Sequence, residues 1–86
     1  MEYRIEFAQR AARDFLKLSP EVQRRVGSKV DSLAADPRPP GWEKLSGIDA
    51  YRIRSGDYRV VYLVDDVAQI VTIARVGHRR DIYRRL

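Results

Sequence analysis

The sequence predicts an α+β fold, in which an antiparallel β-sheet carries an N-terminal helical hairpin on one face. Two observations predict it. Apolar residues recur at every second position near the N-terminus and then at helical spacing from Ala8, and three strand-like blocks follow a proline-rich loop. The predicted element order is β-α-α-β-β-β. The 86 residues have room for one domain, 1–86, and for little more.

The first half of the chain contains one predicted strand and two predicted helices. Tyr3, Ile5 and Phe7 alternate with charged residues, which is typical of a half-buried strand. From Ala8 to Leu18 the spacing is helical, and the polar residues form an outer face: Arg10, Arg13, Asp14 and Lys17. Ser19 and Pro20 are a suitable N-cap and first residue for a second helix, which we expect to end near Ala35.

The second half reads as a loop followed by three strands. Residues 36–41 contain three prolines and a glycine, which stop the helix and predict a stiff loop. The expected strands are Ala50–Arg54, Tyr58–Asp65 and Ala68–Gly77, with Ser55-Gly56-Asp57 and Asp65-Asp66 as the turns. Residues 60–64 are apolar on both faces, as expected of a central strand. Residues 80–86 have two readings, a short C-terminal helix or an ordered tail.

The composition argues against several classes of protein. There is no cysteine, which excludes disulfides and thiolate zinc sites, and the single histidine argues against a metal site. No nucleotide-binding fingerprint or Ser-His-Asp pattern is present, so we expect no cofactor. The N-terminus lacks an apolar signal core, and the longest apolar run is too short to cross a membrane. A cytoplasmic protein is expected.

The positive charge is concentrated in the C-terminal part. The net charge is +5, and residues 51–86 carry eight arginines against four aspartates, with no lysine. A positive field attracts polyanions, and the arginine fork suits phosphate better than an ammonium group does. This distribution predicts an RNA phosphate backbone as the target. On charge alone, a basic surface without a ligand explains it equally well.

Strand alternation predicts where these arginines gather. Arg52 and Arg54 point to one side of their strand, and Arg59 follows just past the tight turn, so it can lie beside them. The positive charges of these three side chains would repel one another, which favours nearby counter-charges or a bound anion. The alternative is three solvated arginines that Asp57 and nearby acids partly neutralise.

The segment after the last strand supplies further candidates. Arg79 and Tyr83 are four residues apart and share a face if this segment is helical. Tyr83 is suited to bond a phosphate or stack on a base, or else to pack the tail onto the sheet. His78, with an ordinary pKa near neutrality, is a candidate for proton transfer or a structural residue.

Two segments carry a family resemblance. Gly-Asp-Tyr-Arg-Val-Val-Tyr at 56–62 and Val-Gly-His-Arg-Arg-Asp-Ile-Tyr-Arg at 76–84, with Tyr-Arg-Ile-Arg at 51–54, resemble the RelE branch of the RelE/ParE toxins. These are the toxin halves of bacterial type II toxin–antitoxin pairs. The resemblance covers almost the whole chain and includes the element order.

The resemblance implies a metal-independent endoribonuclease that cuts mRNA in the ribosomal A site. The ribose 2′-OH attacks the adjacent phosphate and leaves a 2′,3′-cyclic phosphate and a 5′-OH. The implied catalytic residues are Arg52, Arg54, Arg59, Arg79 and Tyr83, and Arg80 joins the four arginines in binding phosphate. Arg59 and Arg79 would hold the scissile phosphate, while Tyr83 would orient the nucleotide or aid proton transfer.

One departure concerns proton transfer. Well-described RelE members carry lysine where this sequence has Arg52 and Arg54. Arginine stabilises negative charge but keeps its proton, so it is a poor acid or base. His78 or Tyr83 could then help to move the proton, the ribosome could supply the missing group, or the enzyme could simply be slower.

The resemblance leaves alternatives and implies a partner. A ParE-like inhibitor of DNA gyrase shares the fold, and a degenerate toxin would bind the ribosome or its antitoxin without cutting. The implied partner is a RelB-like antitoxin that covers either the basic surface or the exposed basic residues of the helices: Arg10, Arg13, Lys17, Arg24 and Arg25. DNA contact is expected only through the antitoxin, and no membrane contact is expected.

Overall fold

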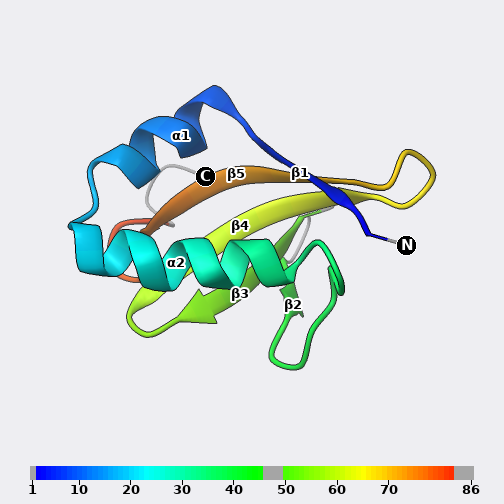
Figure 1. Ribbon diagram of the computed structural model, residues 1–86. Helices are drawn as coiled ribbons and strands as arrows, with labels where there is room; N and C mark the ends of the chain where they lie inside the picture. The colour runs from blue at the N-terminus through cyan, green and yellow to red at the C-terminus, as the bar shows by residue number, and fades with distance from the viewer. Residues whose placement is uncertain (1, 46–49, 83–86) are drawn as a thin grey trace.

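The computed structural model describes residues 2–45 and 50–82. The chain order is β1 (Arg4–Phe7), α1 (Gln9–Leu16), α2 (Pro20–Ser32), β2 (Glu43–Lys44), β3 (Tyr51–Ser55), β4 (Tyr58–Asp65) and β5 (Ile70–His78). Figure 1 shows both helices on one side of a twisted sheet. Within the described ranges, neither helix has the length and apolar character that crossing a membrane would require.

The sheet is mixed, with the strand order β1-β5-β4-β3-β2. The α+β class and the helical layer on one face are confirmed, but the purely antiparallel sheet is wrong in one respect, because β1 pairs with β5 in parallel. Both helices and three strands separate these two neighbours, so no hairpin forces them to run in opposite directions. The two-residue strand β2, which pairs with β3, was not predicted.

Both helices start close to their predicted positions and end earlier than predicted. Ser19 caps α2, because its Oγ accepts a hydrogen bond from the Val22 amide at 3.3 Å and Pro20 takes the first helical position. The eight residues of α1 have no side-chain cap, and Ala11 is fully buried. A helix this short is marginal alone, so its packing on the sheet stabilises it.

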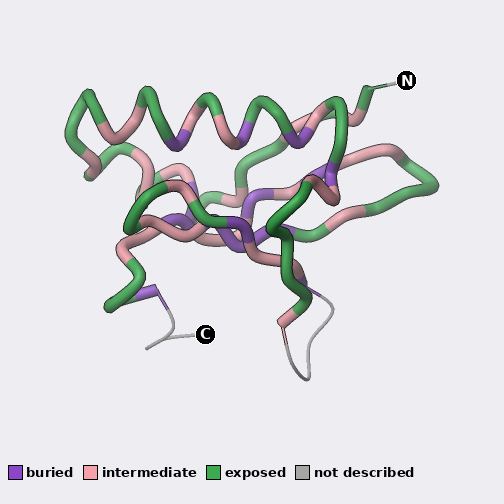
Figure 2. Tube along the Cα trace, turned by 90° about the horizontal axis from the view of Figure 1, so that it is seen from below, coloured by how far each residue is buried: buried purple, intermediate pink, exposed green. Residues whose placement is uncertain are grey.

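The core lies mainly between the helices and the sheet. It is made of Ala11, Val26, Val30, Leu33, Ile53, Val60, Tyr62, Val71, Ile73 and Val76. A smaller cluster of Ala50, Val61 and Ile82 covers part of the opposite face. In Figure 2, α2 lies on one side of the sheet and the segment that follows β5 lies on the other. The helices therefore cover one face of the sheet, and the smaller cluster lies on the other face.

Asp14 corrects the predicted outer face of α1. Its Oδ2 accepts hydrogen bonds from Arg75 Nε at 2.9 Å and from the Val76 amide at 3.0 Å. The pairing of β1 with β5 ends at Ile73, so the edge of β5 beyond it has no neighbouring strand. Asp14 supplies the acceptor that this edge lacks.

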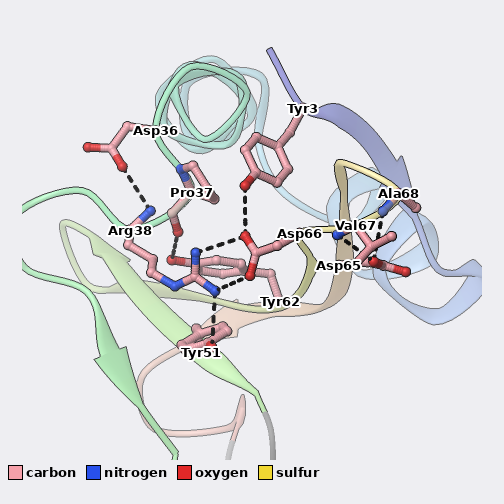
Figure 3. A network of polar contacts seen from close by, with 10 residues as sticks. All are labelled: Tyr3, Asp36, Pro37, Arg38, Tyr51, Tyr62, Asp65, Asp66, Val67 and Ala68. Atoms are coloured by element: carbon pink, nitrogen blue, oxygen red, sulfur yellow. Dashed lines mark hydrogen bonds and ion pairs between the residues drawn. The ribbon is translucent and has the colours of Figure 1, made fainter. Parts of the chain in front are cut away.

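A polar network holds the proline-rich loop against the sheet (Figure 3). Arg38 donates to both carboxylate oxygens of Asp66, at 3.1 and 2.9 Å, and Tyr3 Oη donates to the same carboxylate at 2.7 Å. The hydrogen bond from Arg38 holds the pKa of Asp66 below its usual range. Tyr62 Oη donates to the Pro37 carbonyl at 2.7 Å, and burial raises the pKa of Tyr62 to about 12.

Candidate nucleic-acid site

Three arginines gather on the sheet face opposite the helices, as strand alternation predicts. Arg54 lies directly opposite Arg59 in the β3–β4 ladder, and Arg52 lies two residues along β3 on the same face. The residues between them, Ile53 and Val60, belong to the core beneath the helices. We call the surface formed by Arg52, Arg54 and Arg59 the arginine face.

The electrostatics of the arginine face favour a bound anion. Like charges directly opposite each other in a ladder are destabilising. Nη1 of Arg59 is buried and finds no hydrogen-bond acceptor in the described part of the chain. A hollow beside these groups is lined by Gly41, Glu43, Arg52, Ile53, Arg54 and Arg59. A phosphate in it would receive charge-assisted hydrogen bonds and relieve the repulsion.

Glu43 on β2 is the acidic member of this site. It pairs with Arg52 across the β2–β3 ladder, and its Oε2 lies 3.1 Å from Arg52 Nη2. The Arg52 hydrogen bond holds the pKa of Glu43 below its usual range, and the charges of Arg54 and Arg59 lower it further. Sequence reasoning missed Glu43, because a two-residue strand shows no alternation that would assign its side chains to a face.

The segment after β5 brings Arg79 to the same end of the sheet. The Arg79 amide donates to the Asp57 carbonyl, in the β3–β4 turn, at 2.8 Å. Ile82 then folds over Gly77, where an added Cβ would lie 3.5 Å from Ile82 Cβ, and Gly77 lies opposite Arg59 in the β4–β5 ladder. The chain therefore crosses the sheet on the side of the arginine face. Arg79 and Arg80 are both exposed there, whereas Tyr83 lies outside the described residues.

The structure does not bring His78 to the arginine face. His78 lies opposite Tyr58, one residue from the Arg59–Gly77 pair, so it points to the other side of the sheet. Its ring packs edge-on against Tyr58 with the centroids 5.5 Å apart, and its Nδ1 accepts from the Arg80 amide at 3.2 Å. His78 thus lines a second pocket, together with Asp14 and Lys17 of the α1 region.

Comparisons with known proteins agree with this architecture. The family model for the ParE toxin of the type II toxin–antitoxin system parDE matches residues 5–83. The chain is 37% identical to the toxin RelG of Mycobacterium tuberculosis, over 99% of this chain and 100% of that protein. It is 35% identical to the mRNA interferase toxin RelE of Escherichia coli, over 92% of this chain and 85% of that protein.

A solved structure shares the fold closely. The crystal structure of the toxin–antitoxin complex RelBE2 from Mycobacterium tuberculosis contains a chain that matches with a TM-score of 0.82 and 30% identity, covering 92% of this chain and 100% of that one. The fold and these matches define a toxin of a type II toxin–antitoxin system. Within that class, the chain belongs to the RelE branch of the RelE/ParE family.

Proposed function

We propose that this toxin is an endoribonuclease that cuts mRNA in the ribosomal A site by attack of the ribose 2′-OH on the neighbouring phosphate. The observation that carries the proposal is the arginine face, where Arg54 and Arg59 lie directly opposite each other in the β3–β4 ladder. Two relatives support it, because one is an mRNA interferase and both match nearly the full length of this chain.

In this proposal the arginines act by stabilising charge. Phosphate attack builds negative charge on the non-bridging oxygens, and fixed donors aimed at that charge are worth most in a partly dry site. Arg59, whose Nη1 is buried, is the fixed donor, and Arg79 is held near it by the hydrogen bond from its amide to the β3–β4 turn. Arg52 and Arg54 orient the RNA strand next to the scissile phosphate. Arg80 contacts a further phosphate. Tyr83 keeps its proposed role of stacking or proton transfer.

We further propose that a RelB-like antitoxin neutralises this chain. The matching Mycobacterium tuberculosis chain comes from a toxin–antitoxin complex. The exposed residues Arg10, Arg13, Lys17, Arg24 and Arg25 give the helical layer a basic outer surface that an acidic segment would complement. The toxin would act in the cytoplasm, where its ribosomal target lies, and would meet DNA only through the antitoxin.

The proposal is tested by programmed ribosomes with a labelled mRNA. We expect the wild-type protein to cut only ribosome-bound message and to leave 2′,3′-cyclic phosphate ends. Arg59→Ala combined with Arg79→Ala should lose at least about 100-fold in cleavage, because it removes two charge-stabilising donors. The antitoxin should still bind this variant. Arg4→Ala, which changes an exposed arginine on β1 at the other edge of the sheet, is the control and should cut normally.

The main competing function is inhibition of DNA gyrase, because the matching family model describes ParE toxins. Gyrase-dependent DNA breaks in cells that express the protein, with intact ribosome-bound mRNA, would favour that function. A binding module without catalytic activity predicts neither mRNA cleavage nor gyrase-dependent DNA breaks. It also predicts that the variant with Arg59→Ala and Arg79→Ala remains as toxic as the wild type.

A further inference from the structure

The arginine face lacks a group that can take up a proton. Attack by a ribose 2′-OH requires the loss of its proton, and arginine keeps its own proton at physiological pH. Of the two sequence-based candidates, His78 points to the other side of the sheet, and Tyr83 lies outside the described residues. We propose that Glu43 is the proton acceptor for the attacking 2′-OH. This inference rests on the proposed function and names the residue that completes its site.

The position of Glu43 supports this role. It lines the same hollow as Arg52, Arg54 and Arg59, so a phosphate held by the arginines would lie beside its carboxylate. Oε2 is tied to Arg52 at 3.1 Å, and 62% of the side chain is exposed, so a ribose can approach it. Arg52 and Arg54 on β3 and Arg59 on β4 are the charged groups that act on this carboxylate. A single hollow thus contains both phosphate donors and a proton acceptor.

Four other carboxylates of the described chain lie elsewhere or have structural partners. Asp65 accepts hydrogen bonds from the Val67 and Ala68 amides, at the far end of β4. Asp14 is bonded to Arg75 and Val76 at the edge of β5, and Asp81 lines the pocket that contains His78. Asp66 is bonded to Arg38 and Tyr3. None of these four lines the hollow of the arginine face.

Glu43 is also held in place, although β2 is only two residues long. The residue before it, Trp42, donates its amide to the Pro39 carbonyl at 3.0 Å and packs edge-on against Tyr51 with the ring centroids 5.4 Å apart. Arg38 lies over the Tyr51 ring, 5.2 Å from its centre, and its hydrogen bond to Asp66 holds it there (Figure 3). The network of the proline-rich loop therefore positions the residue next to the arginine face. A catalytic group needs such support to act reproducibly.

The chemistry balances without a further reactant. The 2′-oxygen forms a bond to phosphorus as its proton passes to the Glu43 carboxylate, and the bond between phosphorus and the 5′-oxygen breaks. The 5′-oxygen takes a proton from water, and Glu43 returns its own proton to water. The arginines hold its pKa low, so Glu43 is in the accepting form throughout the neutral range. A carboxylate with a low pKa is a weaker base, but it is always ready to accept.

The test compares Glu43→Gln with the wild type on ribosome-bound mRNA, from about pH 6.5 to 8.5, under single-turnover conditions. Glutamine keeps an oxygen that Arg52 can donate to, but it cannot accept the proton. We expect the cleavage rate to fall by about 100-fold to 10,000-fold at neutral pH. The wild-type rate should be flat with pH, because Glu43 stays ionised. The variant rate should rise about tenfold per pH unit, because hydroxide must replace the missing acceptor.

A conservative variant separates the chemical role from a structural one. Glu43→Asp retains a carboxylate with a shorter reach, so we expect an intermediate rate with a flat pH profile. Fluorescence of Trp42, which is the single tryptophan of the chain, reports whether β2 keeps its place in each variant. If Glu43→Gln cuts at the wild-type rate, or is slowed by the same factor at every pH, the assignment of Glu43 is wrong while the proposed function stands. If the wild type does not cut ribosome-bound mRNA at all, both the proposed function and the assignment of Glu43 are wrong.

Discussion

Arg54 and Arg59 lie directly opposite each other in an antiparallel ladder, where a sequence selected for stability alone would place opposite charges. Arg52, by contrast, faces Glu43 across the next ladder. Two successive positions on the same face of β3 therefore have the same side chain, but one lies opposite a negative charge and the other opposite a positive charge. Such a conflict between local charge and fold stability is typical of functional sites.

This contrast predicts opposite effects for the same substitution at the two positions. Arg54→Glu replaces a repulsive pair with an attractive one, so we expect unfolding in urea to become less favourable by about 0.5 kcal/mol. Arg52→Glu places a second carboxylate opposite Glu43 and should destabilise by a similar amount. Both variants should lose cleavage. If Arg54→Glu is also less stable than the wild type, the arginine pair is not a source of strain in the free protein.

At the scale of the elements, the ion pair between Asp14 on α1 and Arg75 on β5 joins the helical layer to the sheet beyond the end of β1. The two side chains are only 14% and 15% exposed, and the same carboxylate satisfies the Val76 amide. An eight-residue helix without a side-chain cap depends on contacts of this kind. Asp14 is therefore part of what keeps α1 on the sheet.

Asp14→Ala should destabilise the fold by about 3 kcal/mol, because it leaves Arg75 mostly buried without its counter-charge and the Val76 amide without an acceptor. Asp14→Asn should cost less, since its amide oxygen can still accept from one of these donors. Chemical denaturation of both variants measures the difference, and this small domain has only a modest margin to lose. Equal losses in the two variants would mean that the charge contributes nothing beyond the hydrogen bond.

The same elements mark what a sequence can predict here and what it cannot. Arg52, Arg54 and Arg59 could be assigned to one face, because alternation along a strand and a tight turn between strands are local features. Asp14 could not be placed, because its partner Arg75 lies 61 residues away and the helical period alone assigned it to the outer face. The sequence did not predict the parallel pairing of β1 or the position of Glu43 for a similar reason. Both depend on how separate strands pair with one another in the sheet, rather than on a local pattern.

On the scale of the whole molecule, the positive surface does not stop at the edge of the sheet. Gly56, with φ of +60°, makes the β3–β4 turn, and Nη1 of Arg25 on α2 lies 3.7 Å from where a Cβ on this glycine would be. The Arg79 amide is bonded to the next residue of the same turn, Asp57. Arginines from β3, β4, α2 and the segment after β5 thus surround the end of the sheet at the β3–β4 turn, while β1 forms the edge strand furthest from β3 and β2.

This arrangement predicts that Arg25 contributes to the affinity for RNA without taking part in cleavage. Arg25→Ala should weaken binding to ribosomes and reduce the slope of log K against log salt by about 0.7 to 0.9, the value expected for one lost phosphate contact. Arg4→Ala is the matched control, because it removes the same charge from β1, where Arg4 pairs with Glu6 at 2.9 Å, and it should leave the slope unchanged. Single-turnover cleavage at saturating protein should be the same in both variants, since neither residue lines the hollow of the arginine face. Equal slopes for the two variants would show that only the net charge of the protein matters, whereas a smaller slope for Arg25→Ala alone would trace the path of the RNA backbone from the arginine face over the turn to α2.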